Sequence, residues 1–139
     1  MNAPATTSVI IIDDHPLFRK GVSQLIALSD QLHLIGEASS GEEGLELARA
    51  LEPDLILLDL NMPRMDGREV LAELKNDTAL KHIPVVVLTT SQAEEDILRA
   101  YELHANCFIG KPVDFAEFVR VVKSIESFWF SVVRLPRSP

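Results

Sequence analysis

Acidic, hydroxyl and ammonium side chains stand directly after the short apolar segments of this chain. They are Asp13, Asp14, Asp59, Thr89 and Lys111. In open α/β sheets, ligands bind beyond the carboxyl ends of the strands, so these side chains are expected to meet along one edge. Two carboxylates about 4 Å apart repel by about 4 kcal/mol at an effective dielectric constant near 20. A hard divalent cation relieves this repulsion, and an oxygen-only site predicts Mg²⁺.

The same edge has the groups that a phosphoryl transfer needs. Asp59 is the expected nucleophile and would form an acyl phosphate. Thr89 can donate a hydroxyl hydrogen bond to a phosphoryl oxygen, and the Lys111 ammonium can neutralise its charge. In-line transfer requires mostly positioning and electrostatic stabilisation, which such a set supplies.

The elements that position these groups alternate along the chain. The predicted strands are residues 9–12, 32–35, 55–58, 85–88 and 107–109, and their unbroken apolar runs indicate strands covered on both faces. The predicted helices begin near Pro16, Ser40, Arg68, Ala93 and Phe115, and the first has Leu17, Val22, Leu25 and Ile26 at helical spacing. Five such units predict a single α/β domain with a doubly wound, five-stranded parallel sheet.

The ordered set of motifs resembles the receiver domain of two-component response regulators. It consists of Asp13-Asp14, Asp59 within Leu-Leu-Asp-Leu-Asn-Met-Pro-Arg-Met-Asp-Gly, Thr89, and Lys111 followed by proline. The resemblance covers about residues 8–126 and implies a flavodoxin-like receiver fold. It also implies a signalling protein, not an enzyme, whose only reactions are Mg²⁺-dependent self-phosphorylation and autodephosphorylation.

The resemblance assigns a role to each matching residue. Asp59 becomes the phosphoacceptor, Asp13 and Asp14 become acids of the Mg²⁺ site, and the backbone carbonyl of Asn61 becomes a further metal ligand. Thr89 and Lys111 contact the phosphoryl group. Thr89 is also the switch hydroxyl, and Phe108 is the aromatic switch residue that responds to phosphorylation.

Two finer resemblances concern the partner. The opening Asp-Asp-His-Pro-Leu-Phe-Arg-Lys-Gly-Val is similar to receivers that precede a helix-turn-helix output domain. The later segments, including Ile-Glu-Ser-Phe-Trp-Phe, are similar to stand-alone response regulators paired with phytochrome histidine kinases. Only 28 residues follow Lys111, which favours the stand-alone type. The implied partner is a histidine kinase, with a bacteriophytochrome as the specific candidate.

Composition excludes several other partners. The net charge of −8 argues against binding to nucleic acid or to an anionic membrane surface. The N-terminal residues have no signal-peptide pattern, and no apolar run is long enough to span a membrane, so a cytoplasmic location is expected. A single cysteine, Cys107, makes an internal disulfide framework impossible.

The C-terminal segment 127–139 is rich in aromatic and apolar residues. Phe128, Trp129, Phe130, Val132 and Val133 exceed what one helix can bury. An apolar patch of this size usually marks an interface. We therefore expect a homodimer through the fourth helix, fifth strand and fifth helix, extended by this segment.

Other interpretations stay open at this point. His15 adjoins the acid pair, but the four histidines lack metal-ligand spacing, so His15 is expected to be a bystander and a transition-metal site is not implied. An aspartyl-phosphate phosphatase would share the nucleophile, Mg²⁺ and lysine, but requires an acid where Asn61 stands. A pseudo-receiver that acts only as an interaction module would have lost the acid pair, Asp59 or Lys111, and none is lost.

Overall fold

Five parallel strands form the centre of the molecule in the computed structural model, which describes residues 6–62, 64–89, 107–110, 116, 118–120 and 123. The elements follow in the order β1 (Thr7–Ile12), α1 (Pro16–Ala27), β2 (Leu32–Ala38), α2 (Gly41–Leu51), β3 (Leu55–Asp59), α3 (Gly67–Asn76), β4 (Val85–Thr89) and β5 (Cys107–Gly110). The strand order is β2-β1-β3-β4-β5, and every pairing is parallel. This order confirms the predicted doubly wound α/β fold.

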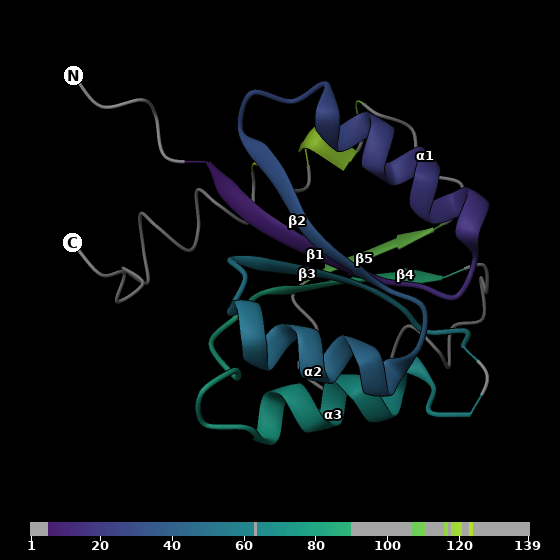
Figure 1. Ribbon diagram of the computed structural model, residues 1–139, viewed down its shortest axis with the longest axis vertical. Coiled ribbons are helices and arrows are strands. Elements are labelled where there is room, and N and C mark those ends of the chain that lie inside the picture. Colours follow the sequence, from purple (N-terminus) through teal and green to yellow (C-terminus); the bar gives the residue numbers. More distant parts are fainter. Residues whose placement is uncertain are drawn as a thin grey trace.

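Helices cover both faces of the sheet. Figure 1 shows α1 on one face, with α2 and α3 side by side on the other. Side chains of β1 alternate between the two layers: Val9 and Ile11 pack with α1 residues, and Ile10 and Ile12 pack with α2 and α3. Strands buried on both faces need apolar residues at every position, which explains the unbroken apolar runs.

Local sequence signals place the helix starts. The Ser40 side chain accepts a hydrogen bond from Glu43 N, and the Asp66 side chain accepts from the backbone N–H groups of Arg68 and Glu69. Such caps satisfy N–H groups that have no partner within the helix. Asp66 therefore caps the start of α3.

Leu17 does not share the buried face of α1. Leu17 has 85% of its surface exposed, whereas Val22 and Ile26 of the same helix are buried. At about 100° per residue, Leu17 lies roughly 140° around the helix from Val22, so it faces away from the sheet. The predicted helix over residues 93–103 lies outside the described residues. Of the predicted last helix, the described residues are helical, and Phe118 is buried in the α1-side core.

Lys75 secures the connection between α3 and β4. Its Nζ donates hydrogen bonds to the backbone carbonyls of Ile83, at 2.9 Å, and Lys81, at 3.2 Å. Burial of the ammonium group lowers the pKa of Lys75 from its ordinary value of 10.5 to about 8.

This shift predicts a pH effect on stability. Between pH 8 and 10.5 the unfolded chain holds a proton on Lys75 that the folded protein has released, so this residue's contribution to folding stability rises with pH in that window. Urea unfolding at pH 7.5 and pH 10 should show the wild type gaining stability relative to Lys75→Met. Lys81→Met, at an exposed lysine, controls for general pH effects. A wild-type advantage that shrinks as pH rises would contradict the prediction.

Candidate functional site

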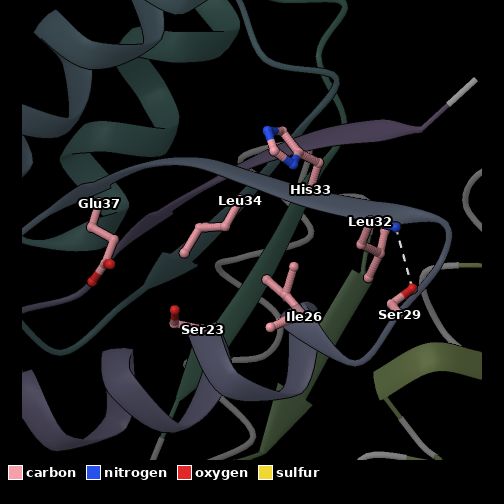
Figure 2. Close-up of a pocket in the computed structure, with 8 residues that line it drawn as sticks. Ser23, Ile26, Ser29, Leu32, His33, Leu34 and Glu37 are labelled. Atoms are coloured by element: carbon pink, nitrogen blue, oxygen red, sulfur yellow. Dashed lines mark hydrogen bonds between the residues drawn. The ribbon is translucent and has the colours of Figure 1, made fainter.

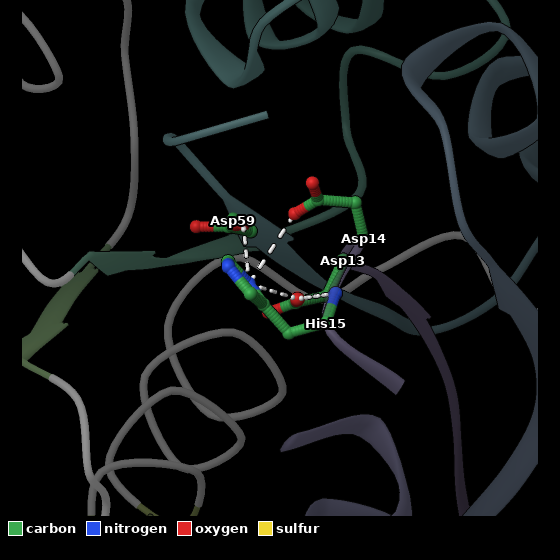
Figure 3. A group of neighbouring side chains, drawn as sticks. All are labelled: Asp13, Asp14, His15 and Asp59. Carbon is green, nitrogen blue, oxygen red and sulfur yellow. Dashed lines mark hydrogen bonds and ion pairs between the residues drawn. The ribbon is translucent and has the colours of Figure 1, made fainter. Parts of the chain in front are cut away.

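Three carboxylates converge at the carboxyl ends of adjacent strands. Asp59 is the last residue of β3, and Asp13 and Asp14 directly follow β1, which pairs with β3. One ligand atom from each of Asp13, Asp14, Asp59 and His15 lies within 4.8 Å of the others. Figure 3 shows these four side chains turned toward one another. The structure thus brings together the three acids that the sequence analysis assigned to one edge.

Backbone hydrogen bonds hold the two buried carboxylates in place. Asp13 and Asp59 are fully buried, and Asp14 is partly buried. Asp13 Oδ1 accepts a hydrogen bond from His15 N at 2.7 Å, and Asp59 Oδ1 accepts one from Asn61 N at 3.0 Å. These short local bonds fix the orientation of each carboxylate at its strand end.

His15 is part of this cluster, which the sequence analysis did not expect. Its Nδ1 lies 3.0 Å from Asp13 Oδ1, 3.2 Å from Asp14 Oδ1 and 3.6 Å from Asp59 Oδ2. The ring is 52% exposed, so it covers the acids on the solvent side. Spacing along the chain did not reveal the contact with Asp59, because Asp59 lies at the end of a different strand, β3.

Two further residues that the sequence analysis missed support the strand ends. Arg19 Nη1 donates a hydrogen bond to the backbone carbonyl of Asp13 at 2.6 Å, and its Nε lies 3.4 Å from a carboxylate oxygen of Glu37. Gly67 N donates to the carbonyl of Leu60 at 3.2 Å. A Cβ at Gly67 would overlap the Asp59 carbonyl oxygen and lie 2.6 Å from Leu60 Cα. Gly67 therefore allows α3 to start directly against the backbone of the Asp59 strand end.

The remaining predicted site residues are described only in part. The backbone of Thr89 ends β4 opposite Gly110, and Phe108 lies in β5 opposite Val87, but neither side chain is among those described. Lys111 lies outside the described residues. Asn61 is exposed and directly follows the Asp59 strand end.

A separate cavity of about 460 Å³ lies between the end of α1 and the edge strand β2. Ser23, Ile26, His33 and Glu37 are among its lining residues, and Ser29 Oγ accepts a hydrogen bond from Leu32 N beside it (Figure 2). None of the clustered acids lines this cavity.

The donor set of the cluster fits a divalent cation. Three carboxylates gathered within 4.8 Å, two of them fully buried, carry excess negative charge. Oxygen ligands of this kind suit hard cations such as Mg²⁺.

Among the described residues, no helix is long and apolar enough to cross a membrane.

Comparison with known proteins identifies the class. The profile of the response regulator receiver domain matches residues 9–123. This chain therefore belongs to the response regulator receiver family, and it is a phosphoacceptor response regulator of the two-component type.

Two response regulators are similar over more than four-fifths of this chain. The chain is 49% identical to response regulator Rcp1 of Synechocystis sp. strain PCC 6803 over 113 residues, which are 81% of this chain and 75% of that protein. It is 43% identical to the nitrate/nitrite response regulator protein NarL of Escherichia coli K12 over 119 residues. That match covers 86% of this chain but only about half (53%) of NarL.

Solved structures are similar over nearly the whole chain. The phosphorylated cyanobacterial phytochrome response regulator RcpA is 40% identical with a TM-score of 0.77, covering 96% of this chain and 100% of that one. The Mn²⁺-bound form of Rcp1 is 39% identical with a TM-score of 0.73, covering 94% of this chain and 99% of that one. The sequence-based family and fold predictions are thereby confirmed.

Proposed function

We propose that Asp59 is the phosphoacceptor of this response regulator. The observation that carries the proposal is the position of Asp59: a buried carboxylate at the end of a central strand, within 4.8 Å of the clustered ligand atoms of Asp13 and Asp14. Asn61 N holds one oxygen of this carboxylate, and the other faces His15. The similar response regulator RcpA has been solved in a phosphorylated form, which supports phosphorylation of this chain.

Asp13, Asp14 and Asp59, with the backbone carbonyl of Asn61, would hold a divalent cation, which we propose to be Mg²⁺. The similar response regulator Rcp1 has been solved in an Mn²⁺-bound form, which supports divalent-ion binding by this chain. When bound, the cation neutralises the carboxylates and the charge on a phosphoryl group. The cluster is thereby suited to accept a dianionic group that three bare carboxylates would repel.

In the transfer itself, an oxygen of Asp59 forms a bond to phosphorus. The bond from phosphorus to the donor atom breaks, and its electron pair leaves with the donor, which is an imidazole of a histidine kinase or acetate from acetyl phosphate. The product is an acyl phosphate on Asp59. Thr89 would donate its hydroxyl hydrogen to a phosphoryl oxygen, and Lys111 would contribute positive charge. Hydrolysis of the acyl phosphate returns Asp59 to the carboxylate.

The phosphorylated state would change one face of the molecule. Thr89 and Phe108 belong to β4 and β5, which are neighbours at one side of the sheet. A new hydrogen bond from Thr89 to the phosphoryl group would shift the equilibrium between two conformations of one face, which is formed by the fourth helix, β5 and the last helix. Charge-assisted bonds are strong enough to shift such an equilibrium.

The proposed partner is a histidine kinase of the phytochrome type. Similarity to RcpA, a phytochrome response regulator, supports this choice. Four further features stay predictions. They are a receiver domain over residues 8–126, an interface segment over 127–139, a homodimer and a cytoplasmic location. The net charge of −8 continues to argue against nucleic acid as a partner.

The two rival functions have less support. A phosphatase of the aspartyl-phosphate class requires an acid two residues after the nucleophile, where this chain has Asn61. A pseudo-receiver would lack part of the acidic cluster, whereas all three carboxylates are present and close together.

Intact-mass analysis after incubation with acetyl phosphate and Mg²⁺ tests the proposal. The wild type should gain one phosphoryl group, and Asp59→Asn or omission of the metal should abolish the gain. Asp66→Asn is the matched control, because asparagine also caps helices and Asp66 lies in the same loop. An adduct that persists in Asp59→Asn, or its absence from the wild type with both acetyl phosphate and a cognate kinase, would contradict the proposal.

A further inference from the structure

The His15 ring lies against the acidic cluster, with its Nδ1 at hydrogen-bond distance, 3.0 Å, from Asp13 Oδ1. His15 is the N-cap residue of α1, yet its side chain makes no capping hydrogen bond. The ring is instead turned to the acidic cluster, where Nδ1 lies within 3.6 Å of an oxygen from each of three aspartates. Its backbone N–H is held by Asp13 Oδ1 at 2.7 Å, which fixes the direction in which the ring leaves the chain.

The spacing of these atoms matches that of ligands around a small cation. First-row divalent ions bind nitrogen and oxygen at about 2.0–2.2 Å, so neighbouring ligand atoms lie roughly 2.8–3.1 Å apart in an octahedral and roughly 3.3–3.6 Å apart in a tetrahedral arrangement. The three distances from Nδ1 to the carboxylate oxygens are 3.0, 3.2 and 3.6 Å. A neutral imidazole can carry its proton on Nε2 and present the lone pair of Nδ1.

We infer that His15 supplies a nitrogen ligand to the cation site. With this ligand, the preference of the site for late first-row divalent ions over Mg²⁺ is stronger than the preference of three carboxylates alone. Imidazole suits ions such as Zn²⁺ and Ni²⁺, whereas Mg²⁺ prefers oxygen. This inference rests on the proposed cation site of Asp13, Asp14 and Asp59 and adds its metal preference. The spacing of the histidines along the sequence had indicated a site with oxygen ligands alone, and the inferred site adds one nitrogen ligand to it.

Calorimetric titration of the metal-stripped full chain with Co²⁺ and with Mg²⁺ tests the inference. In His15→Asn, the Kd for Co²⁺ should rise about tenfold or more, and the Kd for Mg²⁺ should change by less than about threefold. Asparagine is a good N-cap residue, so α1 should keep its start. His33→Asn removes an exposed histidine on β2 and should change neither Kd.

A second readout observes the ring itself. The imidazole nitrogen resonances of His15, assigned by comparison with His15→Asn, should shift when Zn²⁺ is added and should shift much less with Mg²⁺. An unchanged ratio of Co²⁺ to Mg²⁺ affinity in His15→Asn overturns the inference. Tighter binding of both ions by His15→Asn also overturns the inference, because it would show that the imidazole ring competes with the cation for the carboxylates.

Asp13→Asn separates this inference from the proposed function. If Asp13→Asn weakens the binding of both ions and His15→Asn weakens the binding of neither, the carboxylate site is supported and only the role of His15 is wrong. If Asp13→Asn leaves the affinity for both ions unchanged, the proposed cation site itself is wrong. Thermal unfolding of each variant without metal confirms that the chain is folded before titration.

Discussion

Gly67→Ala is expected to lower the free energy of unfolding by about 3 kcal/mol or more, one of the largest losses from adding a single methyl group to this chain. The added carbon would overlap the carbonyl oxygen of Asp59 and lie 2.6 Å from Leu60 Cα. These are backbone atoms at the end of a central strand, so they cannot rotate away as a side chain would. Relief of the overlap must displace either α3 or the strand end.

The same substitution should slow phosphorylation. A shift of the Asp59 backbone moves the carboxylate relative to Asp13 and Asp14, and displacements of about 1 Å can cost roughly a hundredfold in rate. Urea unfolding and the rate of acetyl phosphate labelling measure the two effects on one sample.

Gly21 provides the matched control. It lies within α1, and a Cβ there would have nothing within 4 Å. Gly21→Ala should therefore stabilise the protein by about 0.5–1 kcal/mol, because alanine favours the helix more than glycine does. Equal effects of the two substitutions would show that the close approach at Gly67 does not constrain the fold.

The effect of Asp13→Asn on the free energy of unfolding is expected to change sign when Mg²⁺ is added. Without the cation, the substitution removes a buried negative charge from a cluster of three carboxylates, and we expect a gain of about 1 kcal/mol. The gain is limited because His15 Nδ1 lies at hydrogen-bond distance, 3.0 Å, from Asp13 Oδ1, and the substitution disturbs this contact. Asparagine retains an oxygen that can accept the hydrogen bond from His15 N.

With Mg²⁺ the wild type should be the more stable protein. A ligand at about 100 times its Kd stabilises the folded state by about 2.7 kcal/mol, and a hundredfold weaker Kd reduces this to about 0.4 kcal/mol. Thermal unfolding in EDTA and in saturating Mg²⁺ measures the reversal. Asp66→Asn should show the same difference from wild type in both solutions. A variant less stable than wild type in EDTA would show that attraction, not repulsion, dominates around Asp13.

The elements of the sheet could be predicted from the sequence because a strand buried on both faces has an unambiguous pattern. The apolar run before Asp59 and the run before Asp13 place both acids at strand ends, and parallel pairing then brings them to one edge. Asp66 could likewise be assigned to the turn before α3, because aspartate and glycine together favour such a turn.

Other features depend on distances that the sequence does not contain. His15 joins the acids because its ring turns back over the strand ends, and no spacing rule describes that contact. Gly67 is required by its approach to Leu60, which is visible only when α3 is packed in place. Leu17 recurs at helical spacing with Val22 and Ile26, yet it is exposed, because only Val22 and Ile26 of α1 are buried.

Borohydride trapping most directly tests whether Asp59 accepts the phosphoryl group. Borohydride reduces an acyl phosphate to the alcohol with loss of phosphate, so an aspartyl phosphate becomes homoserine at the modified position. The full chain would be treated with acetyl phosphate and Mg²⁺, reduced, digested and sequenced by tandem mass spectrometry. We predict homoserine at position 59 and aspartate at positions 13, 14 and 66. Homoserine at any of those three positions, with aspartate intact at 59, would contradict the account.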